Sequence, residues 1–149
     1  MARITDPAVL LPKALGGDRR SLARLITIVE NDGTAANDVL ARVFPKGGSA
    51  WTTGLTGAPG AGKSTLTDRL IEQIRTRDIE VAVVAVDPSS PFSGGAVLGD
   101  RVRMQDHIDD AGVYIRSMAS RGHLGGIAEA TPRVVTTLDG IGFSEILVE

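Results

Sequence analysis

The sequence contains no cysteine and few aromatic residues, and both absences narrow what the protein can do. With no Cys among 149 residues, disulfides, thiolate metal sites and cysteine nucleophiles are excluded. Aromatic residues account for only 3% of the chain, whereas hydrophobic residues reach 42%. Aliphatic side chains must therefore form the core, and a chain of this length suits one compact domain better than two.

Excess positive charge and long apolar runs are also absent. The formal net charge is −2, so no basic field attracts nucleic acid or anionic lipid. No apolar run approaches the ~18 residues of a membrane span, and Asp6 and Pro7 stand where a secretory signal needs basic and then apolar residues. We expect a soluble, cytoplasmic protein that binds neither nucleic acid nor membrane.

Residues 1–49 are predicted to form a helical amino-terminal extension. Asp18 is a typical helix N-cap residue, and Gly33 stands where the helix that follows it should end. Thr34 is predicted to cap a second, shorter helix that ends at Pro45. The simplest interpretation of this pair is packing without chemistry. The apolar residues at helical spacing in the first helix are Leu22, Leu25, Ile26 and Val29.

From residue 50 onward, short apolar runs alternate with amphipathic stretches, which predicts that the main domain covers residues 50–149. The expected strands cover 51–56, 81–86, 113–117 and 146–148, and the expected helices cover 63–77, 101–110 and 131–138. In the first of these helices, Leu66, Leu70, Ile71 and Ile74 are predicted to face inward. Such alternation indicates an α/β fold with helices on both faces of a parallel sheet. Ligands of such sheets bind at the carboxyl ends of the strands.

A phosphate-binding loop is the clearest motif, because it follows a predicted strand and opens a predicted helix. Glycines let successive N–H groups point at phosphate oxygens, and the helix amino end adds partial positive charge. Lys63 is expected to reach the β and γ phosphates, and the Ser64 hydroxyl to ligate magnesium. The predicted nucleotide-binding residues are Gly57, Ala58, Pro59, Gly60, Ala61, Gly62, Lys63, Ser64 and Thr65. With this loop, the predicted α/β fold is of the P-loop NTPase type.

Three acidic residues are candidates for a magnesium site at the same sheet edge. Asp87 ends the apolar run 81–86, so its carboxylate should emerge beside the phosphate loop, although Asp87-Pro88-Ser89 is also a typical turn. Asp100 follows a long glycine-rich stretch and is either a helix cap or part of a loop ordered by phosphate. Glu149 would stand at the end of the fourth strand. Hydrolases with a phosphate loop place an acidic residue there, which controls the magnesium ion or the attacking water.

Other polar residues of the predicted ligand face give weaker indications. Arg121 could contact phosphate or a partner, but solvated arginine is the commoner outcome. His107 and His123 are more than a helical turn apart and have no cysteine to complete a site, which argues against zinc.

Several stretches together resemble the MeaB/ArgK family of GTPases, some of whose members were also labelled lysine/arginine/ornithine transport kinases. The resemblance extends over nearly the whole chain from residue 17, and the blocks around Asp87 and Asp100 are more specific than the phosphate loop alone. The matching stretches are residues 17–27, 56–65, 86–90, 94–101, 116–118 and 121–126.

This resemblance implies a GTP-hydrolysing chaperone for adenosylcobalamin-dependent methylmalonyl-CoA mutase, with GTP or GDP as ligand, Mg²⁺ as cofactor and a homodimer for the full-length protein. It also implies that Lys63 and Ser64 bind phosphate and magnesium, and that Asp87, Asp100 and Glu149 belong to the magnesium and hydrolysis site. The catalytic residues would be Lys63, Asp100 and Glu149, and the metal ligands Ser64, Asp87, Asp100 and Glu149.

The sequence departs from this family at its end. The Asn-Lys-x-Asp motif that selects guanine and the carboxyl-terminal dimerisation arm are not in the chain, so we expect an amino-terminal fragment. Two alternatives stay open: an ATP-dependent kinase or transport ATPase on the same loop, and a non-catalytic fragment that acts as an interaction module.

Overall fold

The computed structural model describes residues 6–87, 105–119 and 129–149. The chain divides into two compact units, which we call the helical unit (Met1–Ala50 with Ala130–Gly142) and the sheet unit (Trp51–Glu129 with Phe143–Glu149). The chain thus enters the sheet unit at Trp51 and returns to the helical unit for one helix. The division into domains at residue 49/50 stays a prediction.

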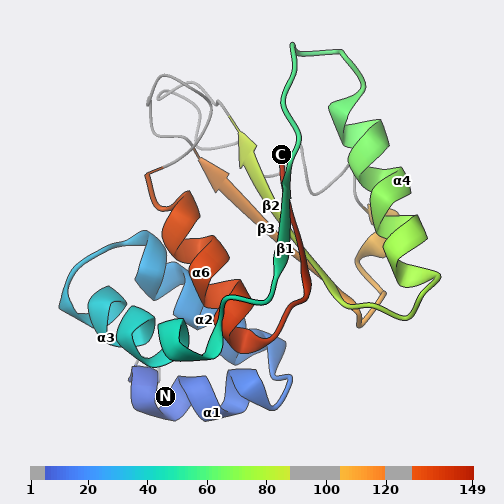
Figure 1. Cartoon of the computed structure of the whole chain (residues 1–149). Coiled ribbons are helices and arrows are strands. Elements are labelled where there is room, and N and C mark those ends of the chain that lie inside the picture. Colours follow the sequence, from blue (N-terminus) through green and yellow to red (C-terminus); the bar gives the residue numbers. More distant parts are fainter. Residues whose placement is uncertain (1–5, 88–104, 120–128) are drawn as a thin grey trace. The chain divides into compact units, whose positions relative to one another are not determined.

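The helical unit is built from helices that bury aliphatic faces against one another (Figure 1). The helix α2 packs against α1 and α3, and α6 packs against α2 and α3. The side chains that are completely or almost completely buried here include Leu10, Leu22, Leu25, Ile26, Val29, Val39 and Val43. The elements are α1 (Pro7–Leu15), α2 (Arg19–Glu30), α3 (Thr34–Val43), the 3₁₀ turn η1 (Phe44–Lys46) and α6 (Thr131–Ile141).

The predicted cap of α2 is confirmed. The Asp18 carboxylate accepts a hydrogen bond from the Ser21 N–H at 3.1 Å and another from the Ser21 hydroxyl at 2.5 Å. The Ser21 hydroxyl bond is the main reason that the pKa of Asp18 lies below its usual value. Because the bond from the Ser21 N–H satisfies a backbone donor that the helix leaves unpaired, it fixes where α2 begins.

Two details of the helical unit differ from the sequence prediction. Gly33, with φ of 95°, does not end α2, whose last residue is Glu30, but occupies the N-cap of α3. Thr34 is accordingly the first helical residue rather than the cap. The positive φ at this N-cap is unfavourable for residues with a side chain, so glycine occupies it although it offers no side-chain acceptor.

Helix α1 was not predicted, although its start signal is present. The Asp6 carboxylate accepts a hydrogen bond from the Ala8 N–H at 2.9 Å, and Pro7 occupies the first turn, where its missing N–H costs nothing. Pro12 lies inside the helix and masks its periodicity in the sequence.

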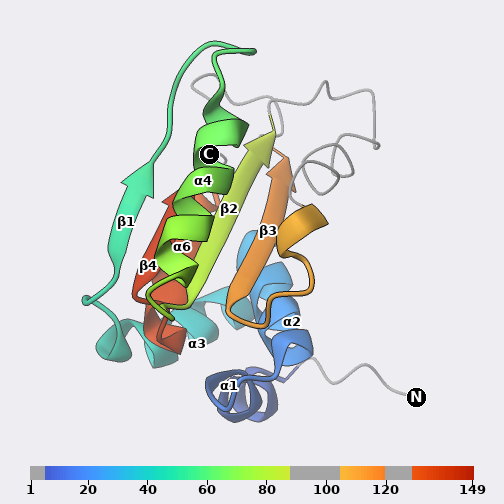
Figure 2. The same ribbon diagram turned by 90° about the vertical axis from the view of Figure 1, so that its right-hand side faces the viewer.

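The sheet unit contains four parallel strands in the order β1-β4-β2-β3. The arrowheads in Figure 2 point the same way, and the loop after β1 lies at that end. The predicted α/β fold with a parallel sheet is confirmed; in the described part of the sheet unit, α4 is the one α-helix. The elements are β1 (Trp51–Gly54), α4 (Lys63–Arg75), β2 (Val81–Asp87), the 3₁₀ turn η2 (Gln105–His107), β3 (Val113–Ala119) and β4 (Glu145–Val148).

Strand β2 lies inside the sheet, between β4 and β3. As its unbroken apolar run predicts, every side chain from Val81 to Val86 is at most 8% exposed. The helix predicted over 101–110, before β3, is wrong in its described part, residues 105–110, because only the short turn η2 forms there.

The buried face of α4 agrees with the prediction at Leu70, Ile71 and Ile74 but not at Leu66. Ile71 is completely buried against Val81, Val83 and Leu147, with Leu70 and Ile74 packed at the margin. Leu66, predicted to face inward, is instead 55% exposed. Thr67, three residues after Ser64, occupies the inward position one turn before Ile71 and is 0% exposed.

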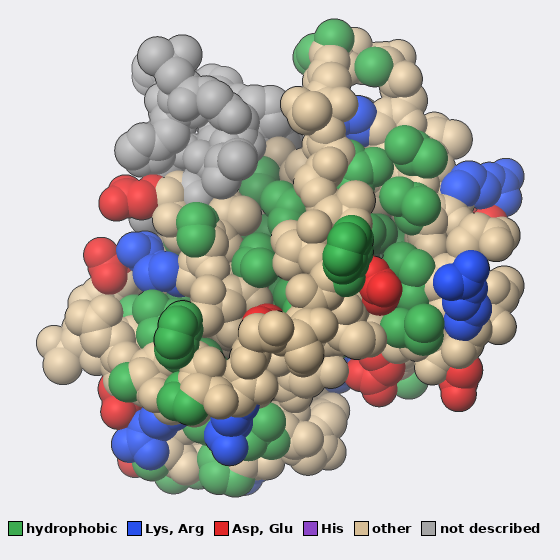
Figure 3. All heavy atoms as spheres, viewed as in Figure 1, with side chains coloured by type: hydrophobic (Ala, Val, Ile, Leu, Met, Phe, Trp, Pro, Cys, Tyr) green, Lys and Arg blue, Asp and Glu red, His purple; other side chains and the backbone are tan. Residues whose placement is uncertain are grey.

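Charges of both signs are mixed on the described part of the surface that Figure 3 draws. Acidic and basic side chains are interspersed on the face drawn in Figure 3, and neither sign gathers into a patch among the residues described there. Among the described helices, none combines the length and the apolar character needed to cross a membrane.

Candidate nucleotide-binding site

The predicted phosphate loop joins the end of β1 to the start of α4. Its residues from Thr56 to Gly62 are exposed, and Gly60 and Gly62 have φ values of 78° and 94°, which side chains rarely allow. Gly62 is the N-cap of α4 and leaves the first turn without a side-chain cap. The N–H groups at this helix end are therefore available to an anion, as phosphate binding requires.

The Lys63 side chain folds back over this loop. Its Nζ donates hydrogen bonds to the carbonyl oxygens of Gly57 at 2.7 Å and of Ala58 at 3.1 Å. The ammonium group is therefore held at the loop from which the anion-binding N–H groups come. An ammonium at this place can exchange the two carbonyls for phosphate oxygens without moving its backbone.

The Glu149 carboxylate contacts two residues near the start of α4. Its Oε1 accepts a hydrogen bond from the Ser64 hydroxyl at 2.5 Å, and its Oε2 lies 2.8 Å from the Thr67 Oγ1. The same Thr67 oxygen is 2.9 Å from the Lys63 carbonyl oxygen. A hydroxyl and a carboxylate thus meet at the carboxyl edge of the sheet, and both are hard oxygen ligands of the kind that magnesium prefers.

The backbone of the sheet sets the position of this carboxylate. The Glu149 N–H donates to the Val84 carbonyl at 2.9 Å, and the Glu149 carbonyl accepts from the Val86 N–H at 2.7 Å. Glu149 therefore continues the β4–β2 ladder and lies opposite Ala85. Asp87, the last residue of β2, is two residues further along the same strand, at the same edge of the sheet.

The structure thus brings some of the predicted site residues together. The phosphate loop, Lys63, Ser64 and Glu149 meet at one edge, and the backbone of Asp87 reaches it. Asp100, Arg121 and His123 lie outside the described residues. The sequence analysis missed Thr67; the signal that could have found it is its spacing of three residues from Ser64, which puts both on one side of a helix. The roles of all these residues in binding and catalysis stay predictions.

One hydrogen bond and one ion pair join the chain before β3 to α4. The buried His107 has its Nε2 2.6 Å from Asp68 Oδ1, and Arg75 Nε donates to Asp110 Oδ2 at 2.9 Å. The bond from Arg75 is the main cause that lowers the pKa of Asp110. Asp68 and Arg75 are seven residues apart, so they lie on one side of α4 and hold two points of the same segment.

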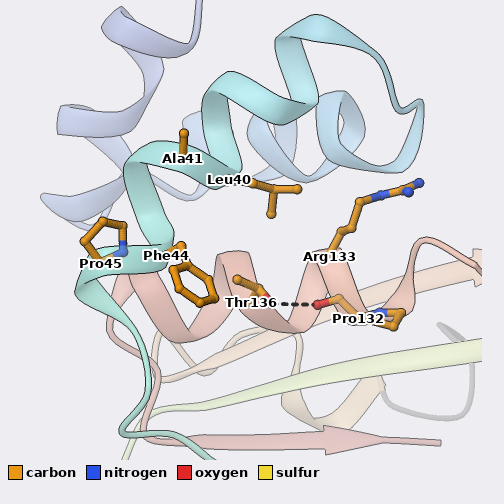
Figure 4. A pocket seen from close by; sticks show the side chains of 7 residues that line it. All are labelled: Leu40, Ala41, Phe44, Pro45, Pro132, Arg133 and Thr136. Atoms are coloured by element: carbon orange, nitrogen blue, oxygen red, sulfur yellow. Dashed lines mark hydrogen bonds between the residues drawn. The ribbon is translucent and has the colours of Figure 1, made fainter.

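A hollow of about 410 Å³ is present in the helical unit (Figure 4). Figure 4 shows Leu40 and Phe44 on one side and Pro132, Arg133 and Thr136 on the other, with the Thr136 hydroxyl bonded to the Pro132 carbonyl. Its lining is almost wholly apolar, and it contains none of the residues predicted to bind nucleotide.

Comparison with known proteins decides the family. The family model described as methylmalonyl Co-A mutase-associated GTPase MeaB matches residues 22–149. The chain belongs to the MeaB family of GTPases. This assignment agrees with the resemblance seen in the sequence and with the parallel α/β sheet of the structure.

Individual relatives of this MeaB-family chain point the same way. A predicted GTPase of Pyrococcus abyssi is 53% identical over 140 residues, covering 94% of this chain and 43% of the relative. GTPase ArgK of Escherichia coli is 36% identical over 137 residues, covering 89% of this chain and 41% of the relative. A fused isobutyryl-CoA mutase of Cupriavidus metallidurans is 39% identical over 144 residues, covering 93% of this chain but 13% of the relative. The chain therefore spans less than half the length of each of these relatives.

Proposed function

We propose that this chain is the phosphate-binding part of a magnesium-dependent GTPase. The observation that carries the proposal is the convergence of an uncapped helix amino end, the Lys63 ammonium and the Ser64–Glu149 pair at one edge of a parallel sheet. Phosphoryl transfer needs charge stabilisation and positioning more than covalent chemistry, and these groups supply both.

The described donor set fits Mg²⁺. Ser64 supplies a hydroxyl and Glu149 a carboxylate, 2.5 Å apart, and Asp87 ends the neighbouring strand at the same edge. We propose that Ser64, Asp87, Asp100 and Glu149 hold the ion, directly or through water. The ion would neutralise charge on the transferring phosphoryl group.

Each remaining side chain has a proposed role toward GTP. Lys63 would leave the carbonyls of Gly57 and Ala58 and stabilise the charge that develops on the γ-phosphoryl group. Glu149, held at the metal position, would with Asp100 orient the attacking water for in-line displacement. The Lys63→Ala variant of the full-length protein should lose GTP hydrolysis, and hydrolysis at the wild-type rate would reject the assignment.

The preference for guanine is supported by the family and not by a base-reading residue in this chain. Binding of fluorescent GTP and ATP analogues to the full-length protein separates the two nucleotides. We expect GTP to bind more tightly. Equal or ATP-favoured affinity would support the kinase or transport ATPase alternative.

We further propose that the full-length protein is a cytoplasmic homodimer that acts as a chaperone for adenosylcobalamin-dependent methylmalonyl-CoA mutase. The family description and the relative fused to an acyl-CoA mutase support a mutase partner. The test is transfer of adenosylcobalamin to purified methylmalonyl-CoA mutase with and without the full-length protein and GTP. Cofactor loading that does not respond to either addition would contradict the chaperone role.

A further inference from the structure

Thr67 is a buried polar residue that the proposed nucleotide chemistry has not used. It is 0% exposed and occupies the inward face of α4, one turn before the equally buried Ile71. An aliphatic residue would fill such a position at no polar cost, so the hydroxyl must be satisfied by hydrogen bonding. Its oxygen lies 2.9 Å from the Lys63 carbonyl and 2.8 Å from Glu149 Oε2.

The bond to Lys63 is the one that threonine commonly makes inside a helix, and it needs no functional explanation. The contact with Glu149 is different, because it joins α4 to a residue 82 positions away that follows β4. The hydroxyl has a single proton, and a carboxylate is a stronger acceptor than a backbone carbonyl. The proton therefore belongs on the bond to Glu149.

This arrangement gives each oxygen of the carboxylate its own partner. Oε1 faces Ser64, the residue assigned to magnesium, and Oε2 faces Thr67. Among the contacts of the described residues, Glu149 without Thr67 would keep only the Ser64 hydroxyl, which the cation also needs. With Thr67, its orientation is fixed independently of that hydroxyl.

We propose that Thr67 is a positioning residue for the magnesium site: it holds Glu149 through Oε2 so that Oε1 stays aligned with Ser64. The proposal rests on the proposed function, since it assumes that magnesium binds at Ser64. Supporting hydrogen bonds of this kind typically change metal affinity by about 10-fold to 100-fold when removed. The proposal gives Thr67 no contact with phosphate or metal, and its effect passes through Glu149.

The test compares Thr67→Val, which keeps the shape and removes the hydroxyl, with Thr67→Ser, which keeps the hydroxyl. Both are made in the full-length protein, and the binding of a fluorescent GDP analogue is titrated with Mg²⁺. We expect Thr67→Val to need about 10-fold more Mg²⁺ for half-maximal effect. Thr67→Ser should stay close to wild type, and affinity for the analogue without Mg²⁺ should be unchanged in both.

A double-mutant cycle with Glu149→Gln provides the second readout. If Thr67 acts through Glu149, the effect of Thr67→Val should largely disappear in the Glu149→Gln background. Unchanged Mg²⁺ dependence in Thr67→Val, equal damage by Ser and Val, or additive effects in the cycle would each overturn the proposal while leaving the GTPase assignment intact. Nucleotide binding that is independent of Mg²⁺ in the wild type and equally strong in the Lys63→Ala variant would overturn the proposed function itself.

Discussion

Replacing Gly140 by alanine tests the packing of the helical unit, because two physical effects predict opposite signs. Gly140 lies inside α6, where alanine is favoured over glycine by about 1 kcal/mol on helix propensity alone. A Cβ at this position, however, would lie 2.5 Å from the Val43 carbonyl oxygen and 2.6 Å from the Val43 Cβ. Carbon atoms in contact prefer about 3.5–4.0 Å, so α3 and α6 would have to separate by about 1 Å.

The cost of the collision with Val43 should exceed the gain in helix propensity. Overpacking typically costs about 1–3 kcal/mol, and the upper end applies here because the obstructing oxygen belongs to the backbone and cannot rotate away. Subtracting the gain of about 1 kcal/mol in propensity leaves a net destabilisation of about 2 kcal/mol. The assay is urea unfolding followed by far-ultraviolet circular dichroism, comparing the midpoint and slope of each variant with wild type.

Gly142→Ala is the matched control for this variant. Gly142 ends α6 with φ of 115° and has no atom within 4 Å of an added Cβ, so its substitution strains the backbone without a collision. We expect it to cost about 1 kcal/mol. A Gly140→Ala protein as stable as wild type, or more stable, would show that α3 and α6 do not approach as closely as described.

Three further predictions concern caps and ion pairs. The Asp139 carboxylate accepts hydrogen bonds from the backbone N–H groups of Gly48, Ser49 and Ala50, so Asp139→Ala should lower the free energy of unfolding by about 2–3 kcal/mol in urea titrations, and an unchanged midpoint would contradict this tether. The pKa of Asp18 is lowered in the folded state, chiefly by the Ser21 hydroxyl, so its contribution to stability is present above its unfolded pKa and is lost as the pH falls through its folded pKa. Asp18→Asn keeps a capping side chain without this titration and should flatten the acid side of the stability–pH curve; an unaltered curve would count against the cap. Arg75→Met removes the main cause of the lowered Asp110 pKa, which should rise toward its usual value in an NMR titration, and no rise would contradict the Arg75–Asp110 pair.

Local signals in the sequence were enough to predict the elements around the phosphate loop. The loop motif predicts both its glycines and the helix that follows. The short apolar run Val81–Val86 is rich in valine, which favours a buried strand over a helix. Glu149 could be predicted because a residue directly after a parallel strand must emerge at the ligand edge of the sheet.

Features that depend on tertiary partners could not be predicted in the same way. Leu66 is the more hydrophobic residue of the pair Leu66–Thr67, yet Thr67 faces inward, because the direction of α4 is set by Ile71 against β2 and β4. Likewise, the periodicity of α6 shows that one face is apolar but not that it packs with α2 and α3. The partnership of Thr67 with Glu149 depends on the register of two distant elements, which no spacing within the sequence encodes.

The central claim, that the loop from Gly57 to Ser64 binds the phosphates of GTP, is tested most directly by calorimetric titration of a non-hydrolysable GTP analogue with Mg²⁺ into the full-length protein and its Lys63→Ala variant. Circular dichroism first establishes that the variant is folded. We expect one site per chain in the wild type and affinity at least 10-fold weaker in the variant, since it loses a charge-assisted hydrogen bond worth about 1.5–3 kcal/mol. Equal affinities in the two proteins would contradict the assignment of the phosphate site.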